Sequence, residues 1–336
     1  MDPHPIRPLT PSPTPGPTIA RGAVLAVRPG PDTGEQFADD LAFAAEIGLQ
    51  QVRLDVPWAI AQPRPGTVDG AVFEQLQSAA LAAKTLGIEP WFRLLQPAVP
   101  HWFDNEGGFT DDRTAGTWWP RWIEAVTNHL GGVAAGWVPM EAPFTMSMRL
   151  VPDDPRRHGE LMHNLVVAWR DAWRILRGGQ PVATSLDVAT ERPVDETVQA
   201  AEAARRRDQL RWGTWLGGLY DGVVRIPGRA DRPLDDLDGA CDIVGLALSG
   251  DVATALYRAA DQGPPRPLAL TLRPRGSTDT EHASAVSSMW RDVRSAASDL
   301  TIASVTAAIL LDEDGRLGLA TTDRRLKDSG EAFVAG

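Results

Sequence analysis

The sequence predicts an α/β protein built as a single (β/α)8 barrel, the TIM barrel architecture, behind a disordered proline-rich leader. The chain has 336 residues, of which 43% are hydrophobic and 23% are charged, a balance typical of a globular protein. Short apolar runs alternate with helical patterns along most of it. The eight strand candidates favour a closed barrel over an open doubly wound sheet.

The leader covers residues 1–20 and contains seven prolines. Proline fixes φ and lacks a backbone N–H, so we expect an extended, disordered segment. The leader has no apolar stretch of the kind that a secretory signal needs. No run in the chain approaches the ~20 apolar residues of a membrane span. We therefore expect a cytoplasmic protein whose barrel occupies residues 21–336.

The strand candidates are short runs that are apolar almost throughout, as in parallel strands buried on both faces. They are 22–27, 51–56, 88–95, 133–140, 181–188, 241–248, 266–272 and 303–311. Helical spacing of apolar residues separates most of them. The predicted helices are 36–47, 71–86, 117–130, 156–177, 194–210, 281–297 and 324–334. No GxGxxG motif follows the first strand, which counts against a dinucleotide-binding fold.

The composition narrows the possible partners. A formal net charge of −11 repels phosphate backbones and anionic lipids, so we expect neither nucleic-acid nor membrane binding. Cys241 is the single cysteine, and its apolar flanks predict an inert core thiol. No histidine pair has the spacing of a zinc motif, and we expect no metal and no cofactor. Twelve tryptophans against two tyrosines suggest a pocket with indole walls.

Several motifs near the predicted strand ends have the order and spacing of a known enzyme family. VRLDVPW at 52–58 contains Arg53 and Trp58, and WVPMEAP at 137–143 begins with Trp137. These segments resemble the second-strand motif and the Trp-x-Thr-x-Asn-Glu-Pro signature of glycoside hydrolase family 1, the β-glucosidase-like retaining glycosidases. Further similar segments are 87–109, 211–222, 242–246 and 316–330. The resemblance covers nearly the whole chain beyond the leader and implies a sugar pocket at the carboxyl ends of the strands.

The same resemblance also shows where this chain departs from the family. Retaining hydrolysis needs an acid/base carboxyl and a nucleophilic carboxylate about 5–5.5 Å apart. The family's acid/base position falls on Ala142, and its nucleophile position falls on Leu272. The family's pocket histidine falls on Gln96. Alanine and leucine can neither attack a sugar nor exchange a proton, so we expect retaining hydrolysis to be absent.

Acidic residues occur instead at three other strand ends, as Asp55, Glu141 and Asp187. Barrel enzymes place their chemistry at these ends, and a carboxylate in a pocket is costly unless it is paired or used. We predict that Glu141, with Asp55 and Asp187, forms the catalytic group. The alternatives are structural: Asp55 or Glu141 would pair with Arg53, and Asp187 would cap the helix that follows it.

Five further residues are predicted to bind the ligand. Arg273 would fill the space of the missing nucleophile with positive charge, and Arg53 and Gln96 would contact the ligand directly. Trp58 and Trp137 would form the indole walls. The alternatives are an ion pair for Arg53, a solvated loop position for Arg273, and core packing for the two tryptophans.

Two functions fit these residues. A repurposed enzyme would use a tuned carboxyl for a cyclisation, elimination or isomerisation of a sugar-like or polyoxygenated small molecule, with general acid–base catalysis worth about 10²–10⁴ in rate. A non-catalytic pseudoglycosidase would bind a glycoside or a protein partner. Because barrels are mostly enzymes and acidic residues have been gained, the sequence favours the first function.

Overall fold

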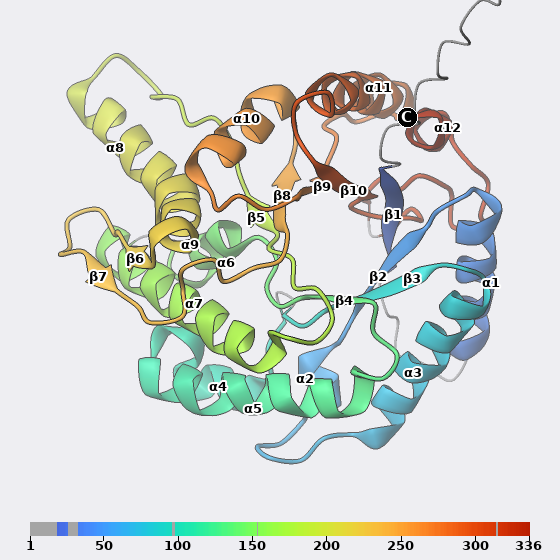
Figure 1. The fold of residues 1–336 in the computed structure, drawn as a ribbon, viewed down its shortest axis with the longest axis horizontal. Coiled ribbons are helices and arrows are strands. Elements are labelled where there is room, and N and C mark those ends of the chain that lie inside the picture. Colours follow the sequence, from blue (N-terminus) through green and yellow to red (C-terminus); the bar gives the residue numbers. More distant parts are fainter. Residues whose placement is uncertain (1–18, 26–32, 96–97, 153, 314) are drawn as a thin grey trace, which may run out of the picture.

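A computed structural model of the chain describes residues 19–25, 33–95, 98–152, 154–313 and 315–336. Eight parallel strands curl into a ring with helices outside it (Figure 1). The strand order is β4-β3-β2-β1-β10-β9-β8-β5, so the first strand of the chain pairs with the last. The strands are β1 (Ala20–Leu25), β2 (Gln51–Asp55), β3 (Glu89–Arg93), β4 (Gly136–Val138), β5 (Leu186–Asp187), β8 (Val244–Leu248), β9 (Leu268–Leu272) and β10 (Ile302–Ala307). Each lies within or overlaps a predicted run, and the predicted (β/α)8 fold is confirmed.

The ring closes between β4 and the segment that precedes β5. The Trp137 backbone N–H donates to the carbonyl of Pro181 at 2.9 Å, and the Ala183 N–H donates back to Trp137 at 2.8 Å. On the other side, the Thr184 N–H donates to Ile243 at 3.1 Å. The segment 181–185 therefore joins β4 to β8 and completes the barrel.

Helices cover the outside of the ring. The longer ones are α1 (Thr33–Glu46), α3 (Gly70–Thr85), α5 (Asp112–Leu130), α7 (Pro155–Leu176), α8 (Val198–Asp208), α10 (Val252–Gln262), α11 (Asp279–Ala296) and α12 (Asp328–Ala335). Shorter ones are α2 (Trp58–Ala61), α4 (His101–Asn105), α6 (Pro143–Leu150) and α9 (Gly218–Asp221). A 3-10 turn (Gly108–Thr110), a π-helix (Gln209–Gly217) and a small hairpin of β6 (Val223–Val224) and β7 (Arg232–Pro233) complete the chain. Among the longer helices of the described residues, α10 is the one that the sequence did not predict.

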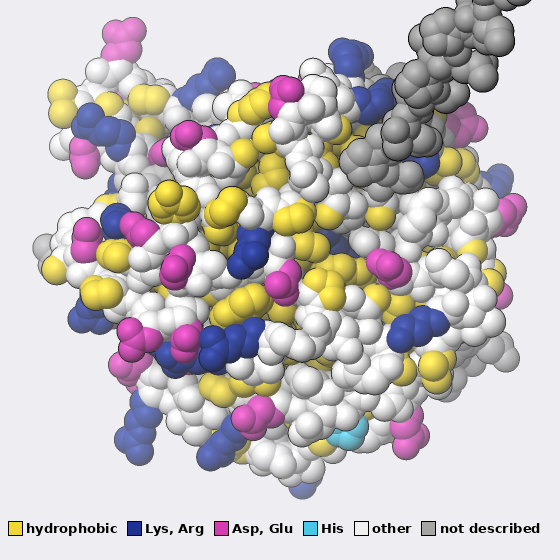
Figure 2. Space-filling model, viewed as in Figure 1, with side chains coloured by type: hydrophobic (Ala, Val, Ile, Leu, Met, Phe, Trp, Pro, Cys, Tyr) yellow, Lys and Arg dark blue, Asp and Glu magenta, His cyan; other side chains and the backbone are white. Residues whose placement is uncertain are grey.

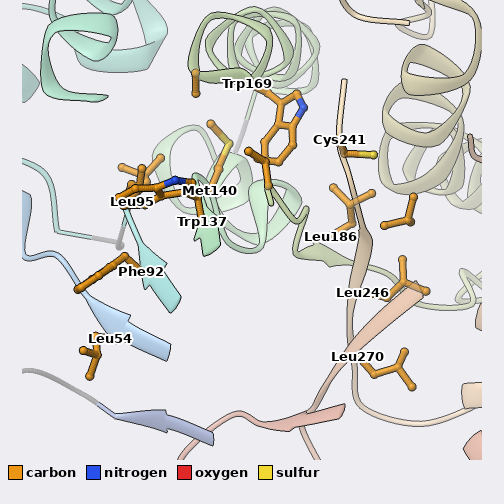
Figure 3. Close-up of a cluster of buried hydrophobic side chains, with 14 of the residues drawn as sticks. Leu54, Phe92, Leu95, Trp137, Met140, Trp169, Leu186, Cys241, Leu246 and Leu270 are labelled. Atoms are coloured by element: carbon orange, nitrogen blue, oxygen red, sulfur yellow. The ribbon is translucent and has the colours of Figure 1, made fainter. Parts of the chain in front are cut away.

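Alternation along the strands divides the core into two layers. Phe92 on β3 and Trp137 on β4 belong to the large core between strands and helices, with ring centroids 5.8 Å apart. Figure 3 shows part of this outer layer. Their strand neighbours Trp91 and Val138 form a separate buried cluster with Ala183. This inner cluster fills the barrel below the carboxyl ends of the strands, as in other barrels of this type.

Three other predictions concern the leader, the single cysteine and membrane spans. Residues 1–18 of the predicted leader lie outside the described residues, and β1 begins at Ala20, so the barrel starts slightly before its predicted boundary. Cys241 is buried, and burial raises the pKa of its thiol to about 12, as expected for an inert core cysteine. No helix in the described ranges is long and apolar enough to cross a membrane. The cytoplasmic location stays a prediction.

Candidate functional site

A cavity of about 920 Å³ opens at the carboxyl ends of the strands. Its wall includes the ends of β2, β3, β9 and β10, the segment after β4, and the loop between β10 and α12. Figure 2 shows apolar side chains around the centre of the molecule, with a few charged side chains among them. A volume of this size suits a small organic ligand. Of the predicted site residues, Asp55, Glu141 and Arg273 line the cavity.

Four charged side chains form a continuous chain of ion pairs along one part of the wall. Arg93, the last residue of β3, donates from Nε and Nη2 to the two carboxylate oxygens of Asp55 at 2.6 and 2.7 Å. Its Nη1 donates to Oε2 of Glu141. Arg273 donates from Nη2 to Oε1 of the same glutamate. Each carboxylate oxygen of Glu141 is therefore held by a different arginine.

Strand register explains how the first pair forms. Asp55 on β2 lies directly opposite Arg93 on β3, so both side chains leave the ladder on the same side. Arg93 was not among the predicted site residues. The signal was present in the sequence, because Arg93 follows the apolar residues Trp91 and Phe92 in the predicted strand, and a buried guanidinium needs a carboxylate partner. The alternative drawn from the sequence gave that pairing to Arg53 instead.

Arg53 lies beneath these pairs, only 3% exposed, and its role differs from the predicted one. Its Nη1 donates to Oγ1 of Thr271 at 2.6 Å, while Nε has no partner among the described residues. Burial, followed by repulsion from Arg93 and Arg273, lowers the pKa of Arg53 to about 9. The predicted alternative, an ion pair of Arg53 with Asp55 or Glu141, is wrong, since Arg93 holds both carboxylates. Arg53 does not line the cavity.

The turn after β4 positions Glu141. Ala142 adopts a left-handed conformation with φ 50°, and its N–H donates to the carbonyl of Ser185 at 2.8 Å. Helix α6 begins directly after it at Pro143. Both Glu141 and Ala142 reach the cavity wall, so the position that resembles the family's acid/base lies at the site but carries only a methyl group. Leu272, on which the resemblance places the family's nucleophile, also lines the cavity.

Asp187 serves α6 rather than the cavity. Its Oδ1 accepts from the Phe144 N–H at 3.0 Å, and its Oδ2 accepts from the N–H and hydroxyl of Thr145 at 2.8 and 2.5 Å. These N–H groups belong to the first turn of α6, where helices lack internal acceptors. Asp187 therefore caps a helix that precedes it in the chain, not the helix that follows it. It is absent from the cavity wall, and the predicted catalytic role finds no geometric support.

Arg211 on the π-helix adds a second set of contacts between Asp187 and the start of α6, and we call this group of contacts the α6 clamp. Its Nη1 donates to Oδ2 of Asp187 at 3.4 Å, and its Nε donates to Glu191 at 2.5 Å. The guanidinium also lies 3.8 Å from the ring centroid of Phe144 in α6. Unusual π-helical geometry often marks a functional region; here it presents Arg211 to the start of α6.

The two predicted indoles do not form cavity walls. Trp58 is fully buried, stacks on Trp122 at a centroid distance of 5.4 Å, and donates from Nε1 to Gln62 at 2.7 Å. Trp137 is 1% exposed and points to the helix layer because of its strand parity. Core packing, the alternative for both indoles, is what the structure shows. Gln96 lies outside the described residues.

The described residues contain no group of three histidine, cysteine, aspartate or glutamate side chains placed to hold a metal ion. Besides the ion-pair chain, the polar or charged side chains that line the cavity are Thr145, Ser277, His282, Glu313, Arg316 and Ser329. Burial lowers the pKa of Arg273, while Asp187 nearby opposes that shift. The Arg273 side chain is 34% exposed, more than Arg93 at 13%, so it is the most accessible cation of the ion-pair chain.

No protein-family model matches the sequence, and no curated protein is similar to it in sequence. Solved structures do match. A family 1 β-glucosidase from Thermotoga maritima aligns over 94% of this chain and 96% of its own, with a TM-score of 0.77 at 14% identity. A β-glucosidase of the same family from Exiguobacterium antarcticum gives 0.79 at 14% identity over the same shares. A β-glycosidase from Pyrococcus horikoshii gives 0.76 at 18% identity over 90% of this chain and 84% of its own. The chain therefore has the glycoside hydrolase family 1-like barrel fold.

Proposed function

We propose that this protein binds a sugar-like or polyoxygenated small molecule in the cavity at the barrel mouth and does not perform retaining glycoside hydrolysis. The fold supports the ligand class, since one of the similar β-glucosidases was solved with deoxynojirimycin. The missing hydrolysis is supported by Ala142 and Leu272, which line the cavity at the positions where the resemblance expects carboxylates.

The two ion pairs of Glu141 are the observation that favours a binding function over a catalytic one. Both of its carboxylate oxygens accept from guanidinium groups, which favours the ionised form. Each carboxylate oxygen of Glu141 is held by an arginine, so one of these contacts must be exchanged before that oxygen can take part in proton transfer. The site is thus better suited to hold a polar ligand through exchangeable hydrogen bonds than to act as a general acid.

Repurposed acid/base chemistry remains the second candidate, on one observation. Asp55 and Glu141 still reach the cavity, with side chains 16% and 12% exposed. A ligand that draws Arg273 away would release Oε1 of Glu141 for use as a base.

The test combines a turnover assay with a binding measurement. We expect the wild-type protein to release no nitrophenol from aryl β-glycosides, and the Ala142→Glu/Leu272→Glu double variant to regain very little activity, because the supporting residues have also changed. We expect octyl β-D-glucoside to bind in calorimetry, with an affinity lowered about tenfold or more in Glu141→Gln.

Glu202→Gln is the matched control, since Glu202 is exposed on α8 and should leave binding unchanged. Wild-type hydrolysis that survives in Glu141→Gln would overturn the proposal. A reaction of any polyoxygenated substrate that Glu141→Gln abolishes, while binding persists, would establish the second candidate instead.

A further inference from the structure

The cavity has two chemically different parts. The polar part is the ion-pair chain of Asp55, Arg93, Glu141 and Arg273. Much of the remaining wall comes from β9, β10, α11, α12 and the loop before α12, and we call its apolar side chains the apolar lobe. Polar side chains from the same part of the chain also line the cavity, namely Ser277, His282, Glu313, Arg316 and Ser329. The main side chains of the apolar lobe are Leu272, Val286, Ile309, Leu317, Leu319 and Phe333. Each hydroxyl of a sugar ring seeks a hydrogen-bond partner, and these side chains provide none. The lobe is therefore built for hydrocarbon.

The polar part itself is balanced, with two arginines against two carboxylates, but the buried Arg53 beneath it adds a third positive charge. Asp187 also lies near Arg273, but it is already paired with Arg211. Arg53 is almost fully buried, and no described carboxylate pairs with it. A buried cation without a counter-ion is costly, and an anion bound nearby would offset that cost.

Arg273 is the point where an anion can meet this charge. It lines the cavity with a third of its side chain exposed, and one of its N–H groups is engaged by Glu141. A guanidinium offers five N–H donors in a planar fork that matches carboxylate and phosphate oxygens. Arg93 is less available, because it already donates three hydrogen bonds to Asp55 and Glu141.

We propose that the ligand is an amphiphilic anion, with a carboxylate or phosphate group bound by Arg273 and a hydrocarbon body in the apolar lobe. This inference rests on the proposed function, that the cavity is a small-molecule site, and it names the class of molecule. A polyoxygenated segment would lie between the two ends, beside Glu141. Polar and apolar contacts would then select the ligand together, because neither part of the wall suits a neutral sugar alone.

The test uses four probes in calorimetry with the full chain, all below their micelle concentrations: octyl β-D-glucuronide, octyl β-D-glucoside, methyl β-D-glucuronide and octyl phosphate. We expect octyl glucuronide to bind about tenfold or more tightly than octyl glucoside, which lacks the charge. We expect the same margin over methyl glucuronide, which lacks most of the hydrocarbon. The ratio of octyl glucuronide to octyl phosphate distinguishes a carboxylate from a phosphate ligand.

Two variants separate the two parts of the wall. Arg273→Gln should reduce the preference for the charged probe to below about threefold while the octyl preference persists. Ile309→Asn should do the reverse. Arg325→Gln, at an exposed arginine paired with Asp323, is the matched control and should change neither ratio. If Arg273→Gln does not fold, the affinity ratio of octyl glucuronide to octyl glucoside is measured on the wild type at low and high NaCl instead. We expect this ratio to fall at high NaCl, because salt weakens an ionic contact, and an unchanged ratio would contradict the contact.

The outcomes distinguish this inference from the proposed function. Equal affinities for octyl glucuronide and octyl glucoside would overturn the anionic ligand and leave the proposed function standing. Equal affinities for methyl and octyl glucuronide would overturn the hydrocarbon body. If no probe binds, both the inference and the proposed function fail.

Discussion

Glu141 and Asp187 are carboxylates at neighbouring strand ends of one barrel, and both contact arginine, yet the structure uses them differently. Asp187 gives its oxygens to the first turn of α6 and to Arg211, away from the cavity. Glu141 gives its oxygens to Arg93 and Arg273, which line the cavity themselves. Backbone donors hold a carboxylate permanently, whereas side-chain donors on a cavity wall can be exchanged for a ligand. The kind of hydrogen-bond donor, more than the residue type or its position, therefore distinguishes a carboxylate that stabilises the fold from one that is available to a ligand.

The largest effect that this comparison predicts is on stability, at Asp187. Asp187→Ala removes the cap of α6 and leaves Arg211 with one carboxylate partner fewer, so we expect a loss of about 3 kcal/mol in the free energy of unfolding. Urea unfolding measures it. Glu202→Ala, at an exposed ion pair on α8, should cost less than about 0.5 kcal/mol. A similarly small loss at Asp187 would mean that α6 does not depend on this clamp.

Removing the charge of Glu141 should cost less. Glu141→Gln leaves three arginines with Asp55 as the remaining carboxylate of the polar part, and we expect a loss of about 1–2 kcal/mol, because Arg273 is one-third exposed. A double-mutant cycle with Arg273→Gln sharpens the comparison. The double variant should be no less stable than Glu141→Gln, with a coupling of about 1 kcal/mol. Strict additivity in urea unfolding would show that the two side chains do not interact in solution.

Thr145 lies between the surroundings of Glu141 and those of Asp187, since it lines the cavity and its hydroxyl donates to Asp187. Thr145→Val keeps the shape and removes that donor, so we expect a loss of about 1 kcal/mol. Binding of octyl β-D-glucoside should change less than about threefold, because Asp187 is not a ligand contact. Calorimetry and urea unfolding on the same preparation check both values. A large loss of affinity would place this hydroxyl in the binding site.

The smallest effect is a pH dependence near α6. Burial, followed by repulsion from Arg206 and Arg211, lowers the pKa of His158, which is hydrogen-bonded to Ser147 of α6. In the unfolded chain the pKa of this histidine is near 6.5. The neutral side chain therefore contributes fully to the free energy of unfolding above that pH, and this contribution is lost as the pH falls towards the lowered pKa of the folded state. Between about pH 7.5 and 5, wild-type stability should fall more than that of His158→Gln. Parallel pH profiles of unfolding would contradict this assignment.

The sequence predicted the strands well because each is a short run of buried apolar residues, and tertiary packing of a parallel sheet requires that pattern. It missed α10, whose buried face is formed by Val252, Ala255, Leu256 and Ala259. These residues have the spacing of an amphipathic helix, so the signal was present in the sequence and was overlooked.

The site was predicted in part. Asp55, Glu141 and Arg273 reach the cavity as expected, because strand ends converge in a barrel. The pairing of Arg93 was missed, since it depends on the register between β2 and β3, which one strand alone does not reveal. Trp137 was misplaced for a similar reason, since a change of one residue in strand parity decides whether its indole faces the barrel interior or the helix layer. Trp58 was misplaced because it begins the short helix α2, which the sequence did not predict and which packs its indole into the core.

The turn between β4 and α6 also limits what a substitution at its centre could do. Ala142 holds a left-handed conformation, its N–H is tied to Ser185, and the next two N–H groups are tied to Asp187. A glutamate acquired at position 142 would inherit this backbone and the direction that it imposes on the side chain. A glutamate that needed another direction would require the anchored turn to loosen first. The capping contacts that stabilise α6 thus also constrain what any carboxylate introduced at position 142 could reach.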